Sequence, residues 1–220
     1  MKYIYLLIIS ILFFSCGKDK VVKLPEINTS EISEINDVSA AYLFYDKTKA
    51  DSVDLNRKNL ISTTNWLVNI DKRLTLKQVI PHIKFLQEKK ANAGHKNEHA
   101  KNYFTCHDIS KNNLGFIEFT NLVYNNTNTL SNLKASPNEI IVNFNTSNII
   151  RVINFKLDTV SKKTTKNNLA KTIKPFDVAE NTIKLHFNSN LLFQDYITYK
   201  EHIITKIKHA KISPIEFIYN

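Results

Sequence analysis

The stretch "LTLKQVIPHIKFLQEKKANAG", residues 74–94, carries the strongest structural signal in this chain of 220 residues. Its apolar side chains recur at intervals of three and four residues, which is the period of a helix with one buried face. They are Leu76, Val79, Ile80, Ile83 and Leu86. The stretch therefore predicts an amphipathic α-helix that packs on a core.

The two ends of this helix are also marked in the sequence. Thr75 followed by Gln78 matches a capping box, in which side chains satisfy the free N–H groups of the first turn. Gly94 is expected to end the helix. Pro81 has no N–H to donate, so we expect it to kink the helix or to delay its start.

A second stretch, "DYITYKEHIITKIKHAKISPIEFIY" at residues 195–219, repeats the pattern. Residues 197–203 align with residues 74–80, 123 positions earlier, as apolar-Thr-apolar-Lys-Glu/Gln-x-Ile. Thr198 and Glu201 would form a second capping box. Chance similarity over seven positions is the alternative, but the flanking segments also match in character.

Both stretches lie between predicted strands. Residues 65–70 and 102–109 flank the first, and residues 182–187 and 215–219 flank the second. We therefore expect two similar strand–helix–strand units, near 65–109 and 182–219, within a single α+β domain at 38–220.

Further strands are predicted at 40–46 and 114–124, with a hairpin at 139–158 closed near "NTSN". Residues 159–173 are expected to form a polar linker. The expected architecture is an antiparallel or mixed sheet with helices on one face.

The N-terminus predicts export. Residues 3–14 form an uncharged apolar run that would be about 18 Å long as a helix, whereas a hydrocarbon core is about 30 Å thick. Such a short run is typical of a secretory signal. Ser15 directly precedes Cys16. This arrangement resembles the lipobox of bacterial lipoproteins, although Phe13 and Phe14 depart from the residues usual at those positions.

The resemblance implies a signal peptide at 1–15 and a lipid attached to Cys16, so that the protein would be membrane-anchored in the cell envelope. Gly17 stands where an aspartate would signal inner-membrane retention, which favours the outer membrane, facing the periplasm. Residues 16–37 are expected to form a flexible tether about 25 Å in span. A plain signal peptide or an N-terminal anchor is the alternative.

The formal net charge is +10. A basic envelope protein suits phospholipid head groups, lipopolysaccharide or acidic glycans, and export argues against nucleic acid as a partner. The lysines are scattered, however, and abundant Lys, Asn and Ile with only three glycines is also what an AT-rich genome produces.

Several chemistries are disfavoured. Gly17, Gly94 and Gly115 are too far apart for a phosphate loop, a dinucleotide fingerprint or a nucleophile elbow, so no cofactor is expected. With Cys16 lipidated, Cys106 has no partner for an intramolecular disulfide and is expected to be buried. On a strand, Cys106 and His107 would point to opposite faces, which rules out a pair between them.

One motif suggests a metal. The segment "HKNEH", residues 95–99, resembles the inverzincin motif, which implies His95 and His99 as zinc ligands and Glu98 as the general base. Gly94 would end the helix just before it, and no apolar face accompanies it. We therefore expect no metal site, and these three residues are the weak candidates.

Four aromatic residues fall at strand positions and are predicted to be core residues: Tyr42, Phe44, Trp66 and Phe116. Any of them that is exposed could serve instead as a platform for a sugar.

These patterns favour an envelope lipoprotein that acts as a non-catalytic binding or accessory protein, with an envelope protein or an anionic glycan as its partner. The sequence identifies no catalytic residues. One alternative is an envelope polymer hydrolase whose site is assembled from dispersed residues. Another is a subunit of an ExbD/TolR-like transport assembly, because a βαβ element after an export signal is loosely similar to the periplasmic domain of those proteins.

Overall fold

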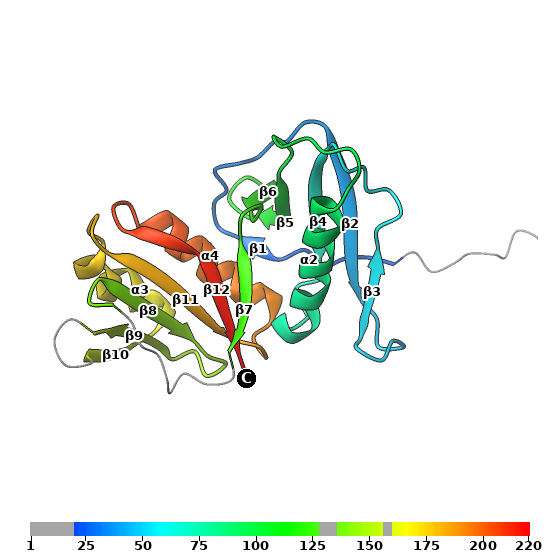
Figure 1. The fold of residues 1–220 in the computed structure, drawn as a ribbon. Coiled ribbons are helices and arrows are strands. Elements are labelled where there is room, and N and C mark those ends of the chain that lie inside the picture. Colours follow the sequence, from blue (N-terminus) through cyan, green and yellow to red (C-terminus); the bar gives the residue numbers. More distant parts are fainter. Residues whose placement is uncertain (1–19, 128–135, 156–159) are drawn as a thin grey trace, which may run out of the picture.

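In the computed structural model, which describes residues 20–127, 136–155 and 160–220, the strands form two six-stranded sheets (Figure 1). The strand order of the first sheet is β1-β5-β4-β2-β3, and β6 pairs antiparallel with β5. Strands β1 and β4 pair with opposite ends of β5. Its strands are β1 (Glu26–Ile27), β2 (Val38–Tyr45), β3 (Val53–Asn56), β4 (Asn65–Ile70), β5 (Asn102–Asp108) and β6 (Asn113–Glu118), and its helix is α2 (Leu76–Ala91).

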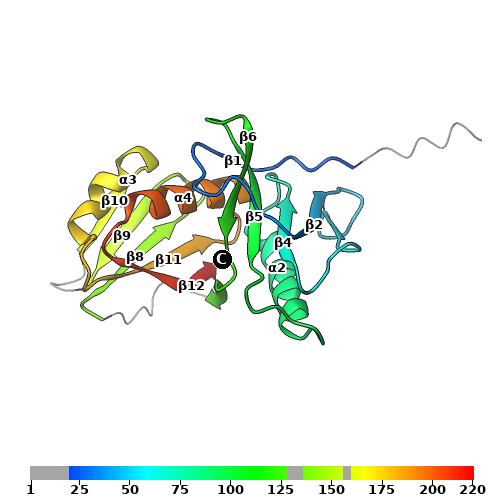
Figure 2. The ribbon, with the colours of Figure 1, turned by 90° about the horizontal axis from the view of Figure 1, so that it is seen from above.

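The strand order of the second sheet is β10-β9-β8-β11-β12-β7. Its strands are β7 (Val123–Thr127), β8 (Glu139–Phe144), β9 (Ile150–Asn154), β10 (Val160–Thr164), β11 (Thr182–Asn188) and β12 (Lys211–Tyr219). Its helical elements are α3 (Lys166–Ile173), the 3-10 turn η2 (Lys174–Phe176) and α4 (Phe193–Lys206). Helices α3 and α4 lie on one face of this sheet (Figure 2).

The predicted α+β class with mixed pairing is confirmed, since helices accompany sheets that hold both parallel and antiparallel strand pairs. The strands form two sheets, however, and not the single sheet that was expected. The hairpin predicted near "NTSN" is also present, because β8 and β9 pair antiparallel. The polar linker expected at 159–173 is wrong: β10 and α3 occupy it, and Leu169 and Ile173 of α3 are fully buried. A helix of eight residues is too short to be stable alone, so packing of these two side chains contributes to its stability.

Helix α2 follows its sequence pattern closely. The five predicted apolar residues are its buried residues, and Thr75 is its N-cap, with Gln78 Oε1 accepting hydrogen bonds from Thr75 N and Thr75 Oγ1. Pro81 lies inside the helix and does not delay its start. The expected stop at Gly94 is wrong, because the helix ends at Ala91 with Asn92 as its C-cap.

Helix α4 differs from its prediction. It begins at Phe193 with Leu192 as its N-cap, so Thr198 lies within the helix and is not a cap. The helix starts early because backbone carbonyls of the first half, and not a side chain, accept its first free N–H groups. Glu201, the other member of the supposed box, accepts hydrogen bonds from Asn28 N and Thr29 N.

The two strand–helix–strand units are present, but the predicted alignment of residues 197–203 with residues 74–80 is wrong, because the units are related by an offset of 117 residues and not 123. Phe193 N donates to Leu74 O at 2.7 Å, and Leu76 N donates to Leu191 O at 2.9 Å. The next pair of amides repeats the exchange, because Lys77 N donates to Ser189 O and Gln194 N donates to Lys72 O. Each donor and each acceptor has its counterpart 117 positions away, so the two helix starts are related by an approximate two-fold axis.

The repeat also extends beyond the predicted strand–helix–strand units. In the first half, β2 pairs parallel with β4 and antiparallel with β3. In the second half, β8 pairs parallel with β11 and antiparallel with β9. Each repeat is therefore a hairpin followed by a βαβ unit, and β10 with α3 is an insertion in the second repeat.

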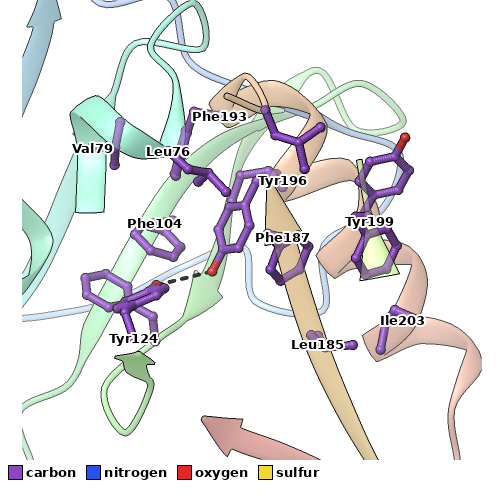
Figure 3. Packing of buried hydrophobic residues seen from close by; sticks show 14 of the residues in the cluster. Leu76, Val79, Phe104, Tyr124, Leu185, Phe187, Phe193, Tyr196, Tyr199 and Ile203 are labelled. Atoms are coloured by element: carbon purple, nitrogen blue, oxygen red, sulfur yellow. Dashed lines mark hydrogen bonds between the residues drawn. The ribbon is translucent and has the colours of Figure 1, made fainter. Parts of the chain in front are cut away.

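A single hydrophobic cluster joins the two repeats. Tyr196 of α4 contacts Phe104 of β5 and Phe187 of β11 edge to face, and its hydroxyl lies 3.2 Å from that of Tyr124 (Figure 3). The two sheets therefore share α4 as part of one core.

Residues 20–37 pack against this core, so the flexible tether predicted for residues 16–37 is wrong over this range. Strand β1 pairs parallel with β5, and Ile27 is 2% exposed. Glu26 N donates to Gln194 Oε1, and Gln194 Nε2 donates back to Glu26 O, both at 2.8 Å. The segment is held in place because several of its backbone groups form hydrogen bonds and Ile27 is buried. None of the helices in the described ranges is long and apolar enough to cross a bilayer.

Candidate functional site: a cationic cleft beside helix α2

A cleft opens between the β3–β4 connection and the C-terminal half of α2. It consists of two adjoining hollows of about 630 and 600 Å³, both lined by Arg57, Leu60 and Lys89. Each volume is within the usual range for a small-molecule site, about 300–1,000 Å³.

The connection that forms one wall is held by its own hydrogen bonds. Ser39 Oγ and Thr64 Oγ1 lie 2.7 Å apart, and Ile61 N donates to Ser39 Oγ. Trp66 Nε1 donates to Ile61 O at 2.7 Å, which ties the loop to β4. The wall is therefore preformed, although its sequence is that of an ordinary polar loop.

An arginine and an aromatic ring define the mouth of the cleft. The guanidinium carbon of Arg57 lies 4.7 Å from the centroid of the Phe85 ring, and Phe85 is 40% exposed. Phe85 lies on α2 but outside the buried apolar stripe. The guanidinium lies over the ring, and its N–H groups make no hydrogen bond to any residue of the described ranges, so they can bind a ligand.

The charges of the cleft are mostly positive and unpaired. Arg57, Lys58 and Lys89 line it, and in the described parts of the chain none of the three forms an ion pair. Of the two acidic residues in the lining, Asp54 is paired with Lys20 at 2.6 Å, whereas Glu88 is unpaired. The three unpaired cations outnumber the one unpaired carboxylate, so the cleft favours an anionic ligand.

Lys90 lies behind the cleft and has a structural role. Its Nζ is 5.1 Å from the Trp66 ring centroid and donates to Thr64 O, Lys101 O and Asn102 Oδ1. Burial lowers the pKa of Lys90 to about 8. With all three hydrogen bonds made inside the protein, this ammonium is committed to holding the end of α2 against β4 and β5.

The weak metal candidates His95, Glu98 and His99 lie exposed in the loop after α2. This loop is not helical, so the helical spacing that the inverzincin motif needs is absent. Within residues 20–127, 136–155 and 160–220, no group of three or more His, Cys, Asp or Glu side chains is placed to hold a metal ion.

Cys106 is buried, as expected, on the inner face of β5, and burial raises the pKa of its thiol. His107 points to the other face, where its Nε2 lies 3.3 Å from Asn112 Oδ1. The predicted separation of thiol and imidazole is therefore confirmed. Asp108 accepts hydrogen bonds from Ser30 N and Ser110 Oγ and holds the local turn.

The four predicted core aromatics are divided. Trp66 and Phe116 are buried, and Phe44 is half-buried. Tyr42 is 36% exposed and stacks on Phe44 with the ring centroids 5.9 Å apart. Only Tyr42 of these four could present a surface to a sugar.

Sequence reasoning missed the cleft because its residues come from segments with no chemical motif. One signal was available: Phe85 is a large aromatic residue that falls outside the stripe of buried residues on α2. Arg57 and Lys58 belong to a loop whose fold depends on distant partners such as Ser39. The predicted lipidation residue, Cys16, and the predicted signal peptide lie outside the described residues.

Comparison of the chain with protein-family models, with curated proteins and with solved structures finds no match.

Proposed function

We propose that this protein is a lipid-anchored envelope protein that binds an anionic glycan without chemical change. The observation that carries this proposal is the cleft beside α2, where Arg57 is stacked on Phe85 and Lys58 and Lys89 are unpaired. The resemblance of residues 1–17 to a lipoprotein signal supports the cellular location.

The chemistry of the cleft suits a sugar that carries carboxylate or sulfate groups. A planar guanidinium can donate two parallel hydrogen bonds to such a group. The exposed part of the Phe85 ring can contact the apolar face of a sugar ring. A protein partner with an acidic surface would use the same cations, but it has less need of a recessed cleft of about 600 Å³.

The small number of unpaired carboxylates in the cleft favours a binding role over hydrolysis. Cleavage of a glycosidic bond typically uses two carboxyl groups, one as an acid and the other as a base or nucleophile. Here Asp54 is neutralised by Lys20, which leaves Glu88 as the single unpaired carboxylate in the lining.

The binding experiment uses the full chain in detergent and oligogalacturonate as the probe. We expect binding that weakens as salt is added, because the contacts are between charges near the surface. Arg57→Ala and Lys89→Ala should each weaken binding about tenfold. Arg57→Lys should recover part of the loss, since it keeps the charge but not the planar group.

Two controls make this test specific. The methyl ester of the same oligomer keeps the sugar rings but removes the charges, and it should not bind. Lys171→Ala removes an exposed cation on α3 and should change nothing. Equal binding of the ester, or full binding by Arg57→Ala, would contradict the proposed site.

The anchor is tested separately. Cys16→Ala should abolish the incorporation of labelled palmitate and release the protein from membranes. Labelling that survives this change would remove the lipoprotein part of the proposal, while leaving the glycan-binding part untouched.

A further inference from the structure

The two repeats differ where their hairpin turns meet the first turns of their helices. In the first repeat this junction is closed. Gln78 Nε2 donates to Asp51 O at 2.8 Å, and His82 Nε2 lies 3.3 Å from Asp51 Oδ2. Gln78 and His82 therefore both fasten the β2–β3 turn to α2 through Asp51.

In the second repeat the same junction is open. The counterparts of Gln78 and His82, 117 positions later, are Asp195 and Tyr199. Tyr199 makes only a long hydrogen bond, 3.5 Å, to Asn148 Oδ1 in the β8–β9 turn. Asp195 is half-buried and has no hydrogen bond or ion pair through its side chain with any residue of the described ranges. A cavity of about 510 Å³ lies in this place.

The insertion that distinguishes the second repeat supplies a wall of the cavity. Thr165, Lys166 and Asn167, at the start of α3, line it together with residues of α4, of the β8–β9 turn and of β1. The unpaired carboxylate thus lines a space that the inserted segment borders. An unpaired, half-buried carboxylate costs stability, and burial raises the pKa of Asp195. A ligand that supplies its missing partners would offset that cost.

The lining identifies the class of ligand. Every residue that lines the cavity carries a side chain able to form hydrogen bonds, and both acceptors and donors are present. Asp195 can only accept while it is ionised, Lys166 can only donate, and Asn148 can do both. An anion would need donors alone and a cation would need acceptors alone. A hydroxyl group both donates and accepts, so a compound with several adjacent hydroxyls matches the set.

We propose that the cavity between α3, α4 and the β8–β9 turn binds an uncharged sugar ring, with Asp195 and Tyr199 as its main contacts. This site lies in the second repeat and shares no residue with the cationic cleft, so the two proposals stand or fall independently. A free monosaccharide and the terminal ring of a polysaccharide offer the same hydroxyls.

The test is saturation-transfer NMR and titration on the full chain in detergent. The probes are glucose, galactose, mannose and N-acetylglucosamine, and trisaccharides of the same sugars. We expect at least one to bind; binding by the monosaccharide indicates a free sugar, and binding by the trisaccharide alone indicates a polysaccharide end. Sulfate and tetramethylammonium, which offer only acceptors or only charge, should not compete.

Variants locate the binding. Asp195→Ala should weaken it at least about tenfold, because a hydrogen bond to a charged group is lost. Its melting temperature should be unchanged or higher, which separates loss of binding from loss of folding. Tyr199→Phe removes the hydroxyl and should also weaken binding. His82→Ala, at the equivalent position of the first repeat, is the matched control and should lower stability without affecting the sugar.

Three results would overturn the proposal: no binding of any probe, binding that is unchanged in both Asp195→Ala and Tyr199→Phe, or displacement of the sugar by sulfate. Arg57→Ala should bind the sugar normally, and a loss there would assign the signal to the cationic cleft.

Discussion

At the scale of single residues, the unusual group is His186 in the middle of β11. It is 1% exposed, stacks on Phe217 at 4.5 Å between ring centroids, and neither ring nitrogen has a hydrogen-bond partner. Its cross-strand neighbour on β8 is Asn143, whose Nδ2 is also unpaired. Burial, with a smaller effect from Lys184, lowers the pKa of His186 to about 4.

This shift predicts a pH dependence of stability. The folded pKa is lower than the unfolded value of about 6.5, so the unfolded chain binds the proton more readily. Stability should be complete above about pH 6.5 and should fall as the pH drops towards 4, by about 3 kcal/mol from this residue. Urea unfolding of the chain at several pH values measures it.

The matched variant is His186→Phe, which keeps the stacking on Phe217 and cannot be protonated. In this variant the free energy of unfolding should lose most of its dependence on pH between pH 6.5 and 4. His202, whose pKa burial also lowers, accounts for a remainder that a second substitution, His202→Leu, should remove. An unchanged pH profile in the double variant would show that histidine burial is not the cause.

At the scale of elements, the first turns of α2 and α4 cap each other. The free N–H groups of a helix start normally require a side chain or water. Here the amides of Leu76 and Phe193 each donate to a backbone carbonyl of the other repeat. This arrangement explains why an apolar residue, Leu192, is tolerated as the N-cap of α4.

Reciprocal capping predicts slow hydrogen exchange where it is usually fast. The amides of Leu76, Lys77 and Phe193 should be protected about as well as amides inside the helices. The amides of Lys166 and Asn167, at the start of α3, are the internal control and should exchange rapidly. Hydrogen exchange is measured by NMR. Equally rapid exchange of both sets of amides would contradict the hydrogen bonds between the two repeats.

A buried ion pair fastens α4 to β12. Lys200 Nζ lies 2.5 Å from Glu216 Oε1, with side-chain exposures of 6% and 1%, and Tyr196 donates to Glu216 Oε2 at 2.7 Å. Lys200→Met leaves the carboxylate buried without its cation, and we expect a loss of about 3–5 kcal/mol in the free energy of unfolding.

The double variant Lys200→Met with Glu216→Leu distinguishes the cost of a lone charge from the value of the pair. It should recover most of the lost stability, because both charges are replaced by apolar groups of similar volume. Denaturant unfolding of the single and double variants gives the comparison. A double variant as unstable as Lys200→Met would mean that the pair itself stabilises the fold.

At the scale of the whole molecule, the N-terminal segment is part of the domain. Residues 20–37 contribute β1, and Gln194 binds both backbone groups of Glu26. Lys72 is linked to the same segment, since it forms an ion pair with Glu26 at 2.6 Å and its N–H donates to Lys23 O.

A chain that begins at residue 38 should therefore be less stable than one that begins at residue 20. The loss should be at least about 2 kcal/mol, the value of burying one isoleucine such as Ile27. The midpoint of urea unfolding for the two chains measures it. Equal midpoints would restore the idea that this segment is a tether.

The sequence by itself determined the class of the fold, helix α2 and the places of the two strand–helix–strand units, although the residue alignment that it suggested between these units was wrong. These depend on local periodicity and on capping residues such as Thr75, which act within a few positions of each other. The sequence could not set the offset of the repeat, because Leu192 is not a capping residue. The start of α4 is decided by carbonyl groups more than 100 positions away.

Only the tertiary structure decided the two candidate sites. Arg57 meets Phe85 across 28 positions, and Asp195 faces Asn148 and Lys166 from separate elements. Nothing in the local sequence marks such residues, because a charge is unpaired only when folding brings no oppositely charged side chain next to it. The described part of the predicted tether, residues 20–37, shows the same principle: a polar segment without periodicity becomes ordered when distant groups such as Gln194 satisfy its backbone.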